Sequence, residues 1–79
     1  MVELERLHKL RKRIDEIDEQ ITELLEERAR IAKEIGEIKK ELNLPIRDEK
    51  REKEVLKRAG KFKKVFEEIM EVCRNVQGL

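Results

Sequence analysis

Apolar side chains recur in alternating steps of three and four residues over the first half of the chain, and this spacing restricts the fold more than any other feature. The positions, which we name the apolar seam, are Leu4, Leu7, Leu10, Ile14, Ile17, Ile21, Leu24, Arg28, Ile31, Ile35, Ile38 and Leu42. Such spacing places side chains along one stripe of an α-helix. It predicts a single helix from about Val2 to Leu42, about 60 Å long. Gly36 inside this helix is either a weak point or a place of close approach.

Arg28 is the one charged residue in the apolar seam. A buried guanidinium is costly to desolvate unless an anion meets it. Taken alone, however, Arg28 is best explained as a residue that fixes helix register or reaches solvent along its own stem. Lys39 supports a binding role, because eleven residues correspond to a rotation of roughly 20° and a rise of ~16 Å. The two cations therefore lean over one face, which predicts a site for a ligand with negative charge near both ends.

Two shorter helices are predicted after Pro45, which ends the first helix because the residue before a proline is pushed out of helical geometry. A short, polar helix opens at Asp48, a good N-cap residue, and runs to about Ala59 before the next glycine. A helix of medium length spans roughly Phe62 to Gln77. Its predicted buried stripe consists of Phe62, Phe66, Ile69, Met70, Cys73 and Val76. We therefore expect one all-α domain over residues 1–79, with one long, one short and one medium helix.

The long helix is expected to need a second copy of the chain. The two shorter helices cannot cover a helix of about 60 Å, and its uncovered apolar surface favours association. If two long helices pack antiparallel with full overlap, Arg11 of one chain lies opposite about residue 34 of the other, between Arg28 and Lys39. Within its own chain Arg11 is ~25 Å from Arg28 and on a different face. An antiparallel homodimer therefore brings together three cations that one chain cannot.

The charge balance bears on the class of partner. Lys and Arg number 20 and Asp and Glu number 19, so the net charge is +1 and provides no overall field for nucleic acid or an anionic membrane. No signal peptide is expected from the sequence, which shows no apolar run long enough to span a bilayer and one cysteine, Cys73. We therefore expect a cytoplasmic protein that binds neither nucleic acid nor membrane.

The short helix carries an acid, a base and another acid on one face. Asp48, Arg51, Glu52 and Val55 follow the spacing i, i+3, i+4, i+7. A helix cap with a local salt bridge is the default explanation in so charged a helix. The functional alternative is a carboxylate that accepts a ligand hydroxyl beside an anion-binding arginine. The combination with the cationic seam favours this alternative.

The third predicted helix adds a neutral donor. Gln77 lies one turn after Cys73 and is either a frayed terminal residue or an amide that faces the site. Cys73 itself is interpreted as a small core residue, and His8, the sole histidine, as an inert residue on an exposed flank. No metal-ligand cluster, nucleophile–base pair or glycine-rich phosphate loop is visible. Neither a metal nor a cofactor is expected.

Four features with a specific spacing are distributed along the chain. They are Arg11, the stretch DEQITELLEER over residues 18–28, the motif IGxxK over residues 35–39, and PIRDxxRE over residues 45–52. Together they resemble the all-helical class of chorismate mutases. The resemblance implies an intertwined antiparallel dimer with two active sites, each completed by Arg11 of the other chain. It also implies that the chain converts chorismate to prephenate, a step toward phenylalanine and tyrosine, without a metal or cofactor.

The resemblance implies which residues hold the two ends of the substrate. Arg28 and the partner's Arg11 would clamp the two carboxylates. Lys39 would reach the ether oxygen and a carboxylate, and Gln77 would lie against the same ether oxygen. Lys39 and Gln77 are therefore the candidates for stabilising the transition state over the ground state, whereas the arginines mainly orient the substrate.

The resemblance also implies roles for the remaining candidate residues. Asp48 and Glu52 would face the ring hydroxyl, with Arg51 nearby. Cys73 occupies a position where some relatives have a serine near a carboxylate. The predicted catalytic residues are Arg28, Lys39, Glu52 and Gln77.

The pattern leaves two other functions open. One is an isochorismate-pyruvate lyase, an enzyme of similar fold and charge pattern that acts on a close isomer of chorismate. The other is a non-catalytic coiled-coil dimerisation module, in which Arg28 only fixes the register of the seam. Such a module would have no affinity for a small dianion, which separates it from both enzymes.

Overall fold

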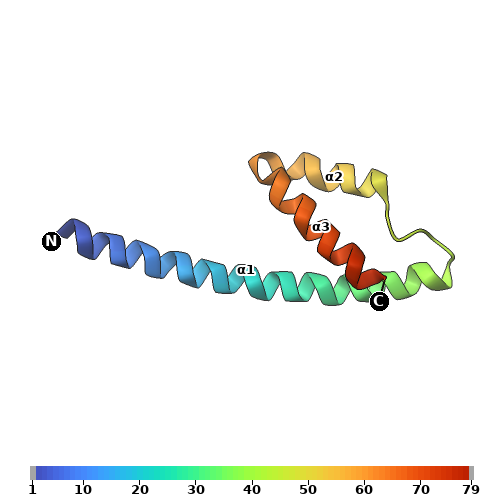
Figure 1. Cartoon of the computed structure of the whole chain (residues 1–79), viewed down its shortest axis with the longest axis horizontal. Helices are drawn as coiled ribbons and strands as arrows, with labels where there is room; N and C mark the ends of the chain where they lie inside the picture. The colour runs from blue at the N-terminus through green and yellow to red at the C-terminus, as the bar shows by residue number, and fades with distance from the viewer. Residues whose placement is uncertain (1, 79) are drawn as a thin grey trace.

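The computed structural model describes residues 2–78 and contains helices and connecting turns (Figure 1). The elements in chain order are α1 (Val2–Glu41), α2 (Glu49–Ala59), a 3₁₀ turn η1 (Gly60–Phe62) and α3 (Lys63–Gln77). The all-α prediction is confirmed, with one long, one short and one medium helix. The molecule measures 61 Å along its longest axis, which agrees with the expected length of the first helix.

The end of α1 follows from its last residues. Asn43 has a φ of 57°, a left-handed conformation that asparagine tolerates at the residue after a helix cap. The Leu44 amide donates to the carbonyl of Lys39 at 2.8 Å, and the Asn43 amide donates to the carbonyl of Lys40 at 3.3 Å. This pair of bonds closes the helix, and Pro45 prevents its continuation. The break was therefore predicted at the right place.

The α2–α3 hairpin begins at a capped helix. Asp48 is the N-cap of α2, and its Oδ1 accepts a hydrogen bond from the Arg51 amide at 3.0 Å. Gly60 ends α2 with a φ of 57°, but the chain then forms a 3₁₀ turn before α3. Phe62 therefore precedes α3 rather than beginning it. Phe62 is 54% exposed, so the prediction that it belongs to a buried stripe is wrong within one chain.

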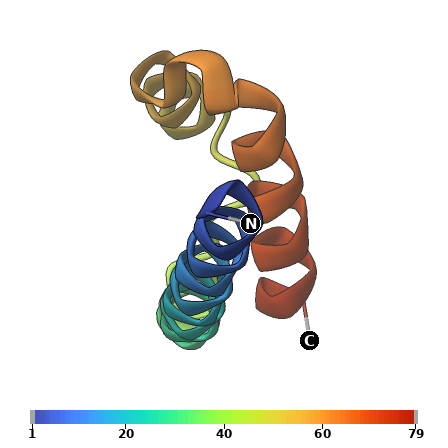
Figure 2. The same ribbon diagram turned by 90° about the vertical axis from the view of Figure 1, so that its left-hand side faces the viewer.

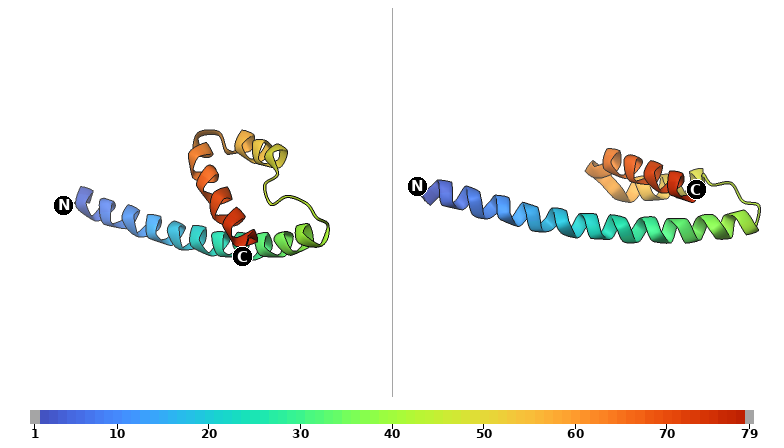
Figure 3. Two further views of the ribbon diagram at one scale, coloured as in Figure 1. Left: turned by 45° about the vertical axis from the view of Figure 1, so that its right-hand side comes forward. Right: turned by 60° about the horizontal axis from the view of Figure 1, so that its bottom comes forward.

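The three helices are arranged as a long rod with a hairpin on one side. α3 packs against the C-terminal half of α1, whereas α2 packs against α3 and not, among the described residues, against α1 (Figures 1 and 3). Viewed along α1, α3 lies beside the long helix and α2 stands farther away (Figure 2). The buried apolar side chains at the centre of this arrangement are Ala32, Val55, Met70 and Cys73.

Gly36 permits the close packing of α3 on α1. A Cβ atom added there would lie 2.9 Å from the Cα atom of Gln77, which is closer than two carbon atoms approach without a shift. Of the two explanations from the sequence, close approach is therefore the right one.

The apolar seam remains largely uncovered within one chain. Leu10, Leu24 and Leu42 are 55%, 64% and 62% exposed, respectively. The N-terminal half of α1 extends beyond the hairpin and has no neighbouring helix among residues 2–78 (Figure 1). In the part of the chain that the structure describes, no helix is long and apolar enough to cross a membrane.

Candidate active site

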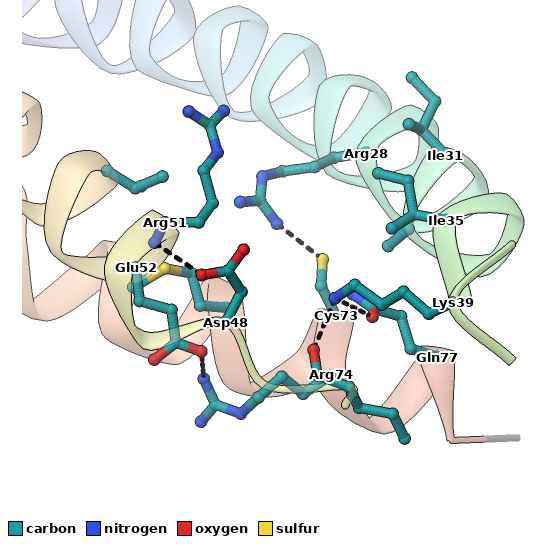
Figure 4. Close-up of a pocket in the computed structure, with 14 residues that line it drawn as sticks. Arg28, Ile31, Ile35, Lys39, Asp48, Arg51, Glu52, Cys73, Arg74 and Gln77 are labelled. Carbon is teal, nitrogen blue, oxygen red and sulfur yellow. Dashed lines mark hydrogen bonds and ion pairs between the residues drawn. The ribbon is translucent and has the colours of Figure 1, made fainter. Parts of the chain in front are cut away.

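A cavity of about 360 Å³ lies between the three helices (Figure 4). The seven predicted site residues that belong to one site of one chain all line it: Arg28, Lys39, Asp48, Arg51, Glu52, Cys73 and Gln77. Arg11 does not line it, because this exposed residue lies on the part of α1 that extends beyond the hairpin. The cavity is therefore built from residues far apart in the sequence, and both the roles of these residues and the dependence of the cavity on a second chain stay predictions.

Lys39 and Gln77 form a pair of donors at one end of the cavity. The Nζ atom of Lys39 donates to Oε1 of Gln77 at 2.9 Å and to the carbonyl of Ile46 at 2.6 Å. Because Oε1 is the acceptor in this bond, the amide nitrogen of Gln77 is not used by it and remains a donor for a ligand. The ammonium and the amide can thus meet one ligand oxygen together.

Arg28 reaches the cavity from the apolar seam. Its NH1 atom donates to the Sγ atom of Cys73 at 2.9 Å, and Figure 4 shows the guanidinium pointing toward the space between the helices. Cys73 is 6% exposed, which agrees with its interpretation as a small core residue. A thiol sulfur is a weak acceptor, and a guanidinium has five N–H donors. Arg28 therefore retains donors for an anion that enters the cavity.

The side chains of α2 form the helix cap and the local salt bridge that the default explanation from the sequence expected. Arg51 forms an ion pair with Glu54 at 3.4 Å rather than with Asp48 or Glu52, and both partners are more than half exposed. Such a pair contributes little to stability, because solvent screens it. Arg51 can therefore exchange this partner for a ligand at small cost.

Glu52 is held by two arginines that the sequence analysis did not select. Its Oε2 atom lies 2.6 Å from NH1 of Arg74, and its Oε1 atom lies 3.2 Å from Nε of Arg47. Arg74 also lines the cavity. Its spacing of four residues from Met70 and three from Gln77 was the signal that could have placed it on this face of α3.

The cavity carries an excess of positive charge. Its lining includes four cations, Arg28, Lys39, Arg51 and Arg74, and two carboxylates, Asp48 and Glu52, which leaves a formal excess of two positive charges. Ile31, Ile35, Val55 and Met70 supply apolar walls. Over residues 2–78, no group of three or more His, Cys, Asp or Glu side chains is arranged to hold a metal ion. The cavity therefore suits a small dianion with an apolar body.

A family model and two curated relatives name the same family. The family model described as chorismate mutase type II matches residues 10–78. The chain is 47% identical over 75 residues to a bifunctional chorismate mutase/prephenate dehydratase of Aquifex aeolicus, which covers 95% of this chain and 18% of that protein. It is 46% identical over 59 residues to a chorismate mutase of Methanocaldococcus jannaschii, which covers 75% of this chain and 60% of that protein.

Two further proteins are similar over most of the chain. A 3-dehydroquinate dehydratase of Pyrobaculum aerophilum is 41% identical over 68 residues, which is 86% of this chain and 23% of that protein. The solved structure of a conserved hypothetical protein from Pyrococcus furiosus superposes with a TM-score of 0.89 at 62% identity, covering 90% of this chain and 93% of that one. The chain spans less than two thirds of the length of each of the three curated relatives.

Proposed function

The chain belongs to the chorismate mutase type II family, and we propose that it catalyses the rearrangement of chorismate to prephenate in the biosynthesis of phenylalanine and tyrosine. The observation that carries this proposal is the convergence of Arg28, Lys39 and Gln77 with the α2 residues around one cationic cavity. Residues 1–79 form one catalytic domain in this proposal.

The reaction needs little beyond what this cavity offers. In the rearrangement one C–O bond breaks while a C–C bond forms within one molecule, so no nucleophile is required. The site has to hold the compact conformer of the substrate and to stabilise the negative charge that develops on the ether oxygen. The Nζ atom of Lys39 lies 2.9 Å from Oε1 of Gln77, so the ammonium and the amide group of Gln77 are close enough to donate to that oxygen from one side.

The other cavity residues bind the substrate in this proposal. Arg28 takes one carboxylate, while Asp48 and Glu52 face the ring hydroxyl near Arg51, and Cys73 fills the wall behind Arg28. Both Glu52 oxygens already accept a bond from an arginine. A carboxylate has about four acceptor positions, so Glu52 can still accept the hydroxyl.

We also infer that two chains pair along their apolar seams as an antiparallel, intertwined dimer. The exposed leucines of the seam support this pairing, because burying such a side chain fully stabilises an assembly by about 1.5–3 kcal/mol. When the two seams overlap, Arg11 of one chain lies opposite the stretch between Arg28 and Lys39 of the other. Arg11 then takes the second substrate carboxylate, and each site is completed by the other chain.

The proposal is tested by the ultraviolet absorbance of chorismate. The purified protein is expected to consume chorismate without an added cofactor, with prephenate as the product. Isochorismate is assayed in parallel, because release of pyruvate would identify a lyase. A Glu54→Gln variant, which removes only the exposed partner of Arg51, serves as a control and should remain active. A protein that leaves chorismate intact would refute the proposed activity.

Gln77→Glu is expected to make the activity depend on pH. An amide donates a hydrogen bond at any pH, whereas a carboxyl group donates only when it is protonated. As the pH falls toward the range in which the new carboxyl is protonated, kcat/KM should rise about tenfold per pH unit. Gln77→Leu cannot donate at any pH, so it should be impaired to the same degree throughout the range. Full activity of Gln77→Glu with no change over pH would show that residue 77 is not involved.

A further inference from the structure

α2 is held in place relative to α1 by its packing on α3. Within residues 2–78, α2 packs against α3 and the 3₁₀ turn but not against α1 (Figures 1 and 3). The cavity nevertheless takes Arg28 and Lys39 from α1, and Arg51 and Glu52 from α2. The distance between these two halves of the site therefore depends on how firmly α2 is held on α3.

Arg74 makes the polar contact that joins α2 to α3. Its NH1 atom lies 2.6 Å from Oε2 of Glu52, and the two side chains are only 28% and 15% exposed. Among the described residues, no other side-chain hydrogen bond or ion pair connects these two helices. The second partner of Glu52 is Arg47, at 3.2 Å and with a side chain 62% exposed. Solvent screens an exposed pair more than a partly buried one, so Arg74 is the stronger partner.

Without Arg74, Glu52 would keep only the exposed Arg47 as a partner, and its charge would act against the binding of an anion. Glu52 lines the cavity, so its negative charge would repel a bound dianion. The same charge would also attract a cavity cation away from the dianion. In Figure 4 the Arg74 guanidinium meets Glu52 on the opposite side of Asp48 from Arg28 and Arg51. Arg74 thus forms the ion pair with Glu52, and Arg28 and Arg51 are not needed for it. Without Arg74, the excess of positive charge in the cavity lining would fall from two to one.

We propose, on the basis of the proposed function, that Arg74 is a positioning residue. Its ion pair with Glu52 holds α2 on α3, and it keeps the Glu52 carboxylate from competing with the substrate for the cavity cations. Arg74 need not touch the substrate for this. It acts on affinity through Glu52 and through the placement of α2. The effect should therefore disappear when residue 52 carries no charge.

The first test compares two arginines that share one carboxylate. Arg74→Met removes the charge but keeps an unbranched apolar side chain, and it should raise the KM for chorismate at least about tenfold with a smaller change in kcat. Arg74→Lys, which keeps the charge, should recover part of the loss. Arg47→Met is the matched control, because it removes the exposed partner of the same Glu52, and it should change KM less than about threefold. Equal effects of Arg47→Met and Arg74→Met would contradict the inference.

The second test is a double-mutant cycle with Glu52→Gln. The amide has the shape of the carboxylate without its charge, so adding Arg74→Met to Glu52→Gln should raise KM little further. If Arg74 only fills space, its removal should impair the Glu52→Gln protein as much as the wild type. That additive result would overturn the proposal.

A third measurement does not require activity. Amide hydrogen exchange in the free protein should become faster in α2 of Arg74→Met, and it should stay unchanged there in Arg47→Met. Unchanged exchange in α2 of Arg74→Met would overturn the inference, whatever happens to KM. If the wild-type protein does not consume chorismate, the proposed function fails, and the exchange experiment still decides whether Arg74 positions α2.

Discussion

Arg28→Ala and Lys39→Ala are each expected to lower kcat/KM for chorismate by about 10²–10³-fold, which is the scale of losing a donor aimed at developing or fixed negative charge. Steady-state kinetics should separate the two residues. Lys39 is proposed to meet the ether oxygen, where charge develops, so its loss should mainly lower kcat. Arg28 is proposed to clamp a carboxylate that is charged throughout the reaction, so its loss should mainly raise KM.

Thermal unfolding gives a second readout of the same two variants. A bicyclic transition-state mimic that binds only the folded protein should raise the melting temperature of the wild type by linkage. Removing either cation should abolish this shift. Arg58→Ala is a suitable control, because Arg58 is an exposed residue near the end of α2 and does not line the cavity. A shift that stays unchanged in both Arg28→Ala and Lys39→Ala would refute the assignment of the pocket.

Another substitution of Arg28 separates an enzyme from a dimerisation module. If Arg28 only fixes the register of the seam, Arg28→Leu should stabilise the dimer without any loss of function. If Arg28 binds substrate, the same change should remove activity even where it raises stability. Urea unfolding measured beside the activity assay distinguishes the two outcomes.

Local signals were sufficient to predict the helices. The seam spacing, Pro45, the Asp48 cap and the glycine after Ala59 placed the helix ends within one or two residues of Glu41, Glu49 and Ala59. The 3₁₀ turn was missed, because a glycine marks the end of a helix but does not specify the turn that follows. For this reason the exposure of Phe62 could not be predicted from its apolar spacing alone.

The part of the cavity that lies on α1 could be predicted, because helical geometry alone determines where its side chains lie. Arg28 and Lys39 share a face of one helix, so their spacing in the sequence determines their relation in space. Arg74 and Glu52 lie on different helices and are 22 residues apart, and no periodicity predicts which charges meet across a hairpin. In a chain with 49% charged residues, every such pairing has many competitors. The ion pairs around Glu52 therefore required the structure.

Mixing Arg11→Ala with Arg28→Ala is expected to restore activity that neither variant has alone. In each homodimer both sites lack one arginine of the clamp. In a mixed dimer, one site receives Arg28 from its own chain and Arg11 from the other, while the second site lacks both. Equal amounts of the two variants, unfolded and refolded together, give mixed dimers as about half of the total, so about a quarter of all sites should regain wild-type activity.

The structure supplies a matched control for this experiment, since Arg28 and Lys39 line the same cavity of one chain. In a mixed dimer of Arg28→Ala and Lys39→Ala, every site still lacks one of the two cations. That mixture should therefore stay inactive, whereas Arg11→Ala with Lys39→Ala should recover like the first pair. Mixing the folded variants without subunit exchange should restore nothing. If the refolded Arg11→Ala and Arg28→Ala mixture forms heterodimers and stays inactive, both arginines serve sites of their own chain, and the proposal of a site shared between chains is wrong.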